Sequence, residues 1–223
     1  GWTERMDPRD PPGAQYNESP TSADTGTLEF TQTTLNADLR GTIDWGIGNS
    51  PLSLGTGLEW REDGYKIEAG DPVSYMYGRT DDRNIPIFGQ AGDIAQPGIQ
   101  GFPGFSPREA VDESRHNWAA YIDTEANLTS DFLLGAAVRY EDYSDFGETV
   151  TGKLSARLDM SPTFAIRSTI STGFRAPGVQ QLFYGQRSTN LNAAGILTDT
   201  LTARQDSDVT RAFGIEPLKE EES

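Results

Sequence analysis

Apolar and polar residues alternate with a period of two along most of this chain, in runs of about ten residues or more. A strand places successive side chains on opposite faces, so this period predicts β-strands with one apolar and one polar face. The six runs have apolar faces that extend over Leu35–Ile47, Leu52–Trp60, Trp118–Leu128, Phe132–Tyr140, Val150–Met160 and Phe164–Phe174. No residue of these apolar faces is charged. The sequence therefore predicts an all-β fold of about six strands.

The length of the runs helps to distinguish apolar faces that pack against a second sheet from apolar faces that meet lipid. A soluble β-sandwich has the same period of two, because the apolar faces of its two sheets pack together. Globular strands are typically ~5–6 residues long, whereas strands that cross a membrane need ~9–11. The large aromatic residues also stand at the ends of the apolar faces, where aromatic girdles meet lipid headgroups. They are Trp45, Trp60, Trp118, Phe132, Tyr140, Phe164 and Phe174.

The connections between the runs also favour strands that cross a membrane. Short turns at 48–51, 129–131 and 161–163 alternate with the segments 70–112, 143–147 and 175–217, two of which are very long. Outer-membrane barrels have short periplasmic turns on one side and long extracellular loops on the other. We therefore expect an antiparallel up-and-down transmembrane β-barrel, present in part. A soluble, lectin-like sandwich that binds through the same loops is the alternative.

Composition along the chain divides it into five segments. Residues 70–112 hold 12 Gly or Pro among 43 positions, which favours a long functional loop. The expected organisation is a loop at 1–24, the first hairpin of the barrel at 25–69, a long extracellular loop at 70–112, a four-stranded antiparallel meander at 113–174, and a second long extracellular loop with the start of the next strand at 175–223.

Charge and residue types exclude several functions. The formal net charge of -16 argues against nucleic acid as a partner, because that needs clustered Lys and Arg. Without cysteine there is no disulfide, thiolate zinc site or cysteine nucleophile. His116 is the only histidine, and its position at the start of a strand favours a solvated loop role. We predict no enzyme activity, metal site or cofactor.

Three acidic sets are interpreted as structural. Asp123 and Glu125 with Arg139 are expected to form a charged ladder that faces a watery lumen. Asp142 with Asp145, and Asp206 with Asp208, have enough oxygens for calcium, but neither pair matches the twelve-residue calcium loop. Acidic, solvated loop tips are therefore the preferred interpretation of both pairs.

One motif resembles a known family. Gly173, Phe174, Arg175, Ala176 and Pro177, followed by Gln180-Gln181-Leu182-Phe183, resemble the Gly-Phe-Arg-Ala-Pro signature of TonB-dependent outer-membrane receptors. The stretch Leu134–Gly147 is similar to the hairpin that precedes the signature in that family, and Gly101–Phe105, Asn117–Tyr121 and Pro217-Leu218-Lys219 fit the same order. The resemblance covers roughly residues 35–223.

The resemblance implies a receptor of the bacterial outer membrane, with lipid around a barrel of about 22 strands and a plug inside it. Energy would come from the TonB complex through the plug, and the solute would be a ferric siderophore, cobalamin or an oligosaccharide. We find no signal peptide, plug or TonB-contacting segment, so the chain is interpreted as an internal piece of the barrel.

Capture of the solute is expected to involve aromatic residues of the two long loops. Their rings could stack on a sugar or an aromatic chelate, or pack the loops against each other. Arg175 follows the last strand and would either anchor the long loop or pair with a carboxylate at the barrel rim. The candidate ligand-binding residues are Tyr75, Tyr77, Phe102, Phe105, Arg175, Phe183 and Tyr184.

Overall fold

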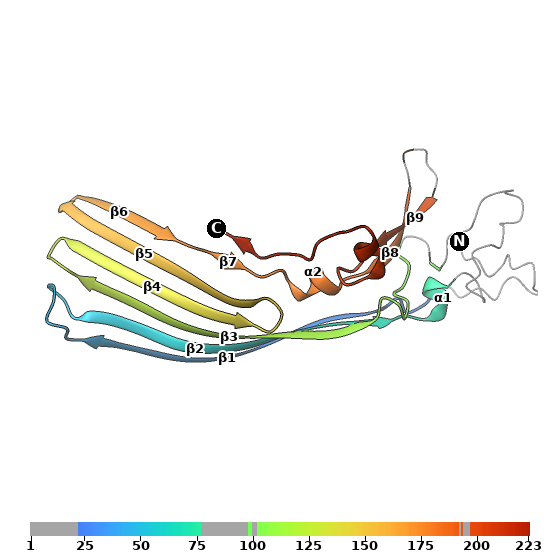
Figure 1. Cartoon of the computed structure of the whole chain (residues 1–223), viewed down its shortest axis with the longest axis horizontal. Coiled ribbons are helices and arrows are strands. Elements are labelled where there is room, and N and C mark those ends of the chain that lie inside the picture. Colours follow the sequence, from blue (N-terminus) through green and yellow to red (C-terminus); the bar gives the residue numbers. More distant parts are fainter. Residues whose placement is uncertain (1–21, 77–97, 100–101, 192, 194–196) are drawn as a thin grey trace, which may run out of the picture. The chain divides into compact units, whose positions relative to one another are not determined.

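Six strands form one sheet in the computed structural model, which describes residues 22–76, 98–99, 102–191, 193 and 197–223. The strands are hydrogen-bonded in chain order, and the pairs from the third strand to the sixth are antiparallel (Figure 1). They are β1 (Gly26–Ile43), β2 (Leu52–Ala69), β3 (Val111–Asn127), β4 (Phe132–Tyr143), β5 (Gly147–Ser161) and β6 (Phe164–Ser171). The predicted count of six strands in an up-and-down order is confirmed.

Smaller elements accompany the sheet. The strands β8 (Gln186–Leu191) and β9 (Leu197–Thr202) form an antiparallel hairpin, and β7 (Phe174–Arg175) pairs with β10 (Glu221–Glu222). The helices are α1 (Pro72–Tyr75), α2 (Val179–Phe183) and α3 (Asp208–Ala212). The strands β8 and β9 were not predicted within the long segment 175–217, because their mostly polar residues carry too weak an alternation to be seen. Among the described residues, no helix has the length and apolar character needed to cross a membrane.

The chain divides into two compact units. Unit 1 comprises 1–30, 64–113 and 179–217, and unit 2 comprises 31–63, 114–178 and 218–223. Unit 1 has a small core of Tyr65, Ile67, Phe105 and Val179. Unit 2 holds most of the sheet and the short turns.

The strand register in unit 2 brings the predicted apolar residues onto one face. Ile122 of β3 pairs with Val138 of β4, and Leu154 of β5 pairs with Ile170 of β6. Since neighbouring residues of a strand point to opposite sides, the charged residues between them share the other face. We call these two sides the apolar face and the polar face of the sheet.

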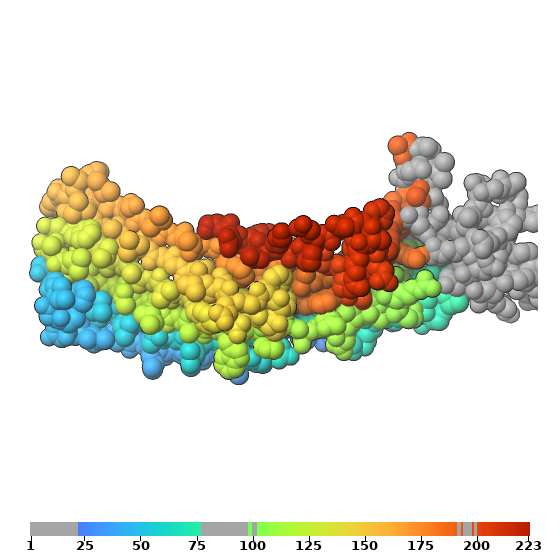
Figure 2. Space-filling model, in the orientation of Figure 1, coloured from blue at the N-terminus to red at the C-terminus, as the bar shows by residue number. Residues whose placement is uncertain are grey.

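The apolar face remains uncovered. Most of its large side chains in unit 2 are exposed, and these keep 39–73% of their surface accessible: Leu35, Leu39, Ile43, Leu58, Trp118, Ile122, Val138, Tyr140, Val150, Leu154, Leu158, Ile166 and Ile170. The space-filling view shows the strands side by side from blue β1 to orange β6, most clearly at the end with the short turns (Figure 2). A sandwich would bury these side chains under a second sheet. The alternative of a soluble sandwich is therefore not supported.

Aromatic side chains flank the apolar face as predicted on most strands. The rings of Trp60 and Trp118 lie 6.4 Å apart between their centroids. Along β4, Phe132 and Tyr140 are separated by about 27 Å at ~3.4 Å per residue, which corresponds to about 20 Å across a membrane at the ~35–45° tilt of barrel strands, and the apolar band is ~25 Å tall. Phe174 was assigned to this face wrongly, because β6 ends at Ser171 and the Phe174 ring packs 5.6 Å from that of Tyr143, on the polar face.

The ends of two strands also differ from the expectation. β1 begins at Gly26 and ends at Ile43, so Trp45 and Ile47 lie beyond it. The indole of Trp45 instead donates a hydrogen bond to the carbonyl of Ser50 at 3.2 Å, within the turn. His116 lies inside β3, since that strand starts at Val111. Its side chain is exposed, and its backbone N–H donates to the hydroxyl of Ser144.

A substitution at Gly57 of β2 tests how side chains pack on the polar face. Tyr121 of β3 extends across Gly57 and donates a hydrogen bond to Asp38 of β1 at 2.6 Å. A Cβ at Gly57 would lie 2.6 Å from the Tyr121 ring and 3.0 Å from the carbonyl of Ala37. We expect Gly57→Ala to cost about 1–3 kcal/mol of unfolding free energy, measured by urea unfolding in detergent.

Gly41 of β1 provides the matched control. A Cβ at Gly41 meets no atom within 4 Å. Because alanine restricts the unfolded chain more than glycine does, Gly41→Ala is expected to be neutral or stabilising by up to about 1 kcal/mol. Equal losses in the two variants would contradict the packing of Tyr121 over Gly57.

Candidate ligand-binding surfaces

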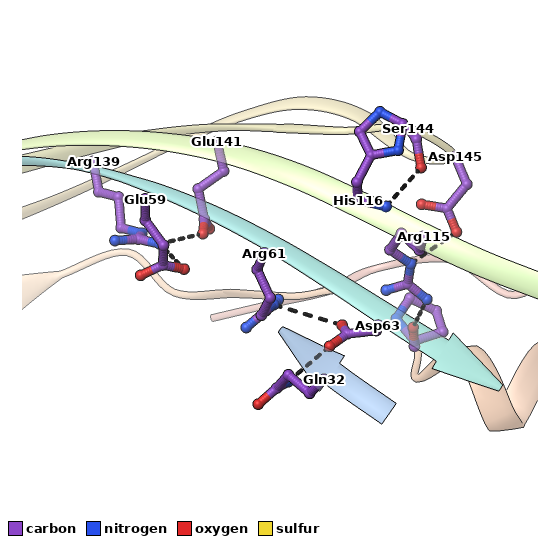
Figure 3. Close-up of polar contacts among 11 residues, drawn as sticks. Gln32, Glu59, Arg61, Asp63, Arg115, His116, Arg139, Glu141, Ser144 and Asp145 are labelled. Carbon is purple, nitrogen blue, oxygen red and sulfur yellow. Dashed lines mark hydrogen bonds and ion pairs between the residues drawn. The ribbon is translucent and has the colours of Figure 1, made fainter. Parts of the chain in front are cut away.

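Charged and polar side chains pair on the polar face, and one of these pairs joins two strands that are not neighbours (Figure 3). The guanidinium of Arg139 on β4 donates to Glu59 of β2 at 3.1 Å and to Glu141 at 2.8 Å. The predicted ladder of Arg139 with Asp123 and Glu125 is therefore corrected: Arg139 reaches past β3 to β2. Ala119 of β3, which pairs with Glu141, is small and leaves room for this crossing.

A second polar group joins β1 and β2. Gln32 donates from its side-chain amide to Asp63 at 2.7 Å, and Arg61 lies 3.5 Å from the other oxygen of Asp63. These contacts, with those of Arg139, place several compensated ion pairs along the polar face. Such pairs are each worth ~0–1 kcal/mol where water reaches them.

Arg115 of β3 is the most buried cation of this face, with 5% of its side chain exposed. Its Nε donates to Asp145 at 3.0 Å, and its Nη2 donates to the carbonyl of Pro177 at 2.6 Å. The guanidinium also lies 5.3 Å from the centroid of the Phe146 ring. Arg115 therefore connects the β4–β5 turn to the Gly-Phe-Arg-Ala-Pro motif. Asp145, a candidate acidic loop tip, is the partner of an arginine.

Asp206 and Asp208, the second pair of acidic candidates, also have cationic partners. Asp206 accepts from Arg204 at 3.0 Å, and Asp208 lies 3.5 Å from Arg211. Among the residues that the structure describes, no group of three or more His, Asp or Glu side chains could hold a metal ion.

A hollow of about 640 Å³ opens on the sheet in unit 2. Ala137 and Gly55 leave space between larger neighbours, and the charged residues of the lining are Arg40, Asp123, Arg139 and Lys153. Its volume falls in the range of ~300–1,000 Å³ that small-molecule sites occupy. Arg139 is already paired with Glu59 and Glu141, so Arg40 and Lys153 are the cations of the lining that could meet a ligand with negative charge.

Three of the predicted loop aromatics, Phe105, Phe183 and Tyr184, meet in the core of unit 1. Phe105 keeps only 4% of its surface exposed and packs with Tyr65, Ile67 and Val179. Phe183 and Tyr184 pack against this core from α2 and the residue after it, and the rings of Phe105 and Tyr184 lie 6.3 Å apart, edge to face. These contacts favour the loop-packing role for Phe105.

Tyr65 was not among the candidate residues, although it contributes to the same core. It lies beyond the first ten or so residues of β2, which suffice to cross a membrane. Burial raises the pKa of its phenol, and the neighbouring Tyr184 raises it further. The neutral phenol is therefore the form present at physiological pH, and it suits an apolar cluster.

The other candidates are more accessible. Phe102 is 53% exposed and contacts Phe105 edge to face at 6.3 Å, and Tyr75 is half-buried at the end of α1. Arg175 is exposed and lies 3.8 Å from Glu221, its partner in the β7–β10 pair. Tyr77 lies outside the described residues. Among the candidate loop aromatics that the structure describes, Phe102 is thus the most exposed.

Truncation of Phe105 and Phe102 tests which of the two rings packs the loops and which contacts a ligand. Phe105→Ala is expected to cost about 3 kcal/mol of local unfolding free energy by leaving a cavity, seen as faster proteolysis of the long loops. Phe102→Ala should leave proteolysis nearly unchanged and weaken solute binding. Equal protease sensitivity of the two variants would contradict this division.

The contacts of Arg115 and of Tyr65 could not be identified from local sequence patterns. Arg115 alternates with its neighbours like any polar-face residue, and its partner Pro177 is 62 residues away. Tyr65 stands beside charged residues in a segment without a distinctive motif. Only its position opposite Phe105 reveals its role.

Comparison with known proteins agrees with this geometry. A family model described as TonB-dependent receptor-like β-barrel matches residues 3–223. The siderophore receptor PirA from Pseudomonas aeruginosa superposes with a TM-score of 0.53 at 16% identity, over 82% of this chain and 28% of that one. A double variant of the ferric enterobactin receptor PfeA from the same organism gives 0.51 at 17%, over 78% and 22%. No curated protein matches.

An amphipathic, up-and-down antiparallel sheet with a charged inner face is part of a transmembrane β-barrel. The chain belongs to the TonB-dependent receptor family, in its β-barrel domain. It spans 22–28% of the length of the two solved receptors. In such a barrel the apolar face meets lipid and the polar face lines the lumen.

Proposed function

We propose that this chain is part of a bacterial outer-membrane receptor that binds a ferric siderophore and imports it in a step energised by TonB. The observation that carries the proposal is the register of β3 to β6, which separates an uncovered apolar face from a charged one. A wall of this kind encloses a watery passage within lipid. The proposed function is capture and transport, without a covalent step.

The kind of solute is supported by two further observations. The hollow on the sheet is lined by more cations than anions, although the chain has 34 acidic and 18 basic residues. Two of the solved structures similar to this chain are a siderophore receptor and a ferric enterobactin receptor. Cobalamin and oligosaccharides are the competing solutes.

Uptake by cells tests the proposal. The complete receptor that contains this chain, expressed in a Gram-negative strain without its own siderophore receptors, should import radioactive iron from a set of ferric siderophores. Import should stop when the gene for TonB is deleted. Import of labelled cobalamin or maltooligosaccharide without any iron uptake would overturn the assignment of the solute.

The orientation of the barrel gives a second test. Protease added to intact cells should cut within 70–112, which we place on the extracellular side. The turn of β5 and β6 at Pro162 should stay protected until the outer membrane is opened, because short turns are periplasmic. Fragments are identified by mass spectrometry. Cleavage at this turn in intact cells would mean that the topology is inverted.

A further inference from the structure

A recess of about 710 Å³ opens on the apolar face of the sheet in unit 2. Its lining comes from β1 to β4, four strands that follow one another in the sheet. We call it the outer recess, because it lies on the face that meets lipid. The lining residues that point to this face by the alternation of the strands are Ala37, Leu39, Thr56, Leu58, Ala120, Ile122, Val138 and Tyr140.

Small side chains between larger ones form the outer recess. Ala120 of β3 pairs with Tyr140 of β4, and Ile122, two residues further along, pairs with Val138. The side chains of Ile122 and Val138 keep 49% and 47% of their surface exposed, whereas Ala120 is half-buried between its neighbours. Ala37 is a second small residue, on β1. The lipid-facing wall is therefore lower at the alanines than around them.

The chemistry of the lining favours hydrocarbon as the occupant. Thr56 brings a hydroxyl group to the outer recess, and this hydroxyl donates to the carbonyl of Tyr121 at 2.8 Å. The aliphatic side chains around it offer no hydrogen bond to water. An apolar cavity of this kind stays dry, and an unfilled one loses the dispersion contacts of its lining. A chain of CH₂ groups restores these contacts.

The charges on the same side of the sheet show how deep in the membrane the outer recess lies. Trp118 pairs with Asp142, and Asp142 pairs with Glu148. Both carboxylates are exposed, and in the next row on this side Tyr140 pairs with Val150. Charged residues facing lipid are tolerated near the membrane surface and not at its middle. The hydrocarbon therefore ends close to Trp118 and Tyr140, and the outer recess begins directly inside that border.

The dimensions of the outer recess match a single flexible chain. It crosses four strands, which is about 14 Å at ~4.8 Å between strands. Barrel strands tilt by ~35–45°, so a chain that stands along the membrane normal passes over several strands. The outer recess is also continuous with the surface that meets lipid.

We propose that the outer recess holds one acyl chain of a membrane lipid. The barrel would then keep a bound lipid at β1 to β4, distinct from the lipid that exchanges around it. This assignment requires only that the apolar face meets lipid, so it holds for any solute that the receptor transports.

Native mass spectrometry of the complete receptor in detergent tests the assignment, with dipalmitoyl phosphatidylethanolamine as the probe. A first lipid should bind more tightly than those that follow. Ala120→Leu fills the outer recess and should weaken binding of that lipid about tenfold, the lower end of what one additional methylene group costs in an apolar pocket. Dipalmitoyl phosphatidylglycerol should bind equally well, because the chain is held. Dihexanoyl phosphatidylethanolamine should bind far more weakly.

Ala136→Leu is the matched control, since it adds the same side chain elsewhere on the apolar face. Ala136 is exposed on β4, pairs with Thr124 and Leu154, and lies outside the outer recess. This variant should bind the first lipid like the wild type. Heat-modifiable mobility in gels checks that both variants fold.

Three results would overturn the assignment. The first is equal affinity of the wild-type receptor and Ala120→Leu for the first lipid. The second is binding of the dihexanoyl lipid as tight as that of the dipalmitoyl lipid, which would indicate a site for the headgroup. The third is a dimer without bound lipid that Ala120→Leu dissociates, which would assign the outer recess to a second copy of the receptor.

Discussion

Ile170→Arg should destabilise the complete receptor by about 2–4 kcal/mol, because it places a guanidinium near the middle of the lipid-facing wall. Ile170 is 73% exposed on the apolar face and pairs with Leu154, the middle residue of β5. The measurement is reversible unfolding in lipid or detergent, supported by the heat-modifiable mobility of the barrel in gels.

Thr169→Arg is the control, with the same new side chain one residue away. Thr169 pairs with Ser155 on the polar face, where water solvates a guanidinium. Its cost should be well under half that of Ile170→Arg, although Arg157 and Arg167 are close by. Equal losses would favour a dry interior, and a larger loss for Thr169→Arg would mean that the two faces are reversed.

Arg115→Ala is expected to cost about 1.5–3 kcal/mol, the usual effect of losing hydrogen bonds to a charged group, because the Asp145 side chain is 33% exposed and water partly replaces its cation. The variant leaves Asp145 without its cation and the carbonyl of Pro177 without its donor. The segment that leads from β7 into α2 should then become accessible to protease, measured together with the free energy of unfolding.

Arg175→Ala is the comparison for this prediction. Arg175 belongs to the Gly-Phe-Arg-Ala-Pro motif, but its side chain is 77% exposed and its nearest carboxylate, on Glu221, is 3.8 Å away. Exposed pairs contribute ~0–1 kcal/mol, so this variant should unfold almost like the wild type. A larger loss for Arg175→Ala than for Arg115→Ala would refute the role given to Arg115.

Assignment of most strand residues to the two faces of the sheet succeeded from the sequence alone, with Phe174 as an exception. The side-chain period of a strand follows from backbone geometry, so the alternation of Ile122, Val138 and Ile170 with charged residues already places them on one face. Strand ends were predicted less well. The threonine-rich start of β1 has no clear alternation, and the pairing of β1 with β2 extends the strand back to Gly26.

The sequence by itself determined the fold class, the number of long strands and the family, because these follow from periodicity and ordered motifs. The tertiary structure decided which polar groups meet. Arg139 pairs with Glu59 rather than with Asp123, since Ala119 is too small to block the crossing. Phe105 is buried because Tyr65 and Val179, far from it in sequence, close around it. Contacts of this kind depend on distances between strands and loops, which no local pattern of residues encodes.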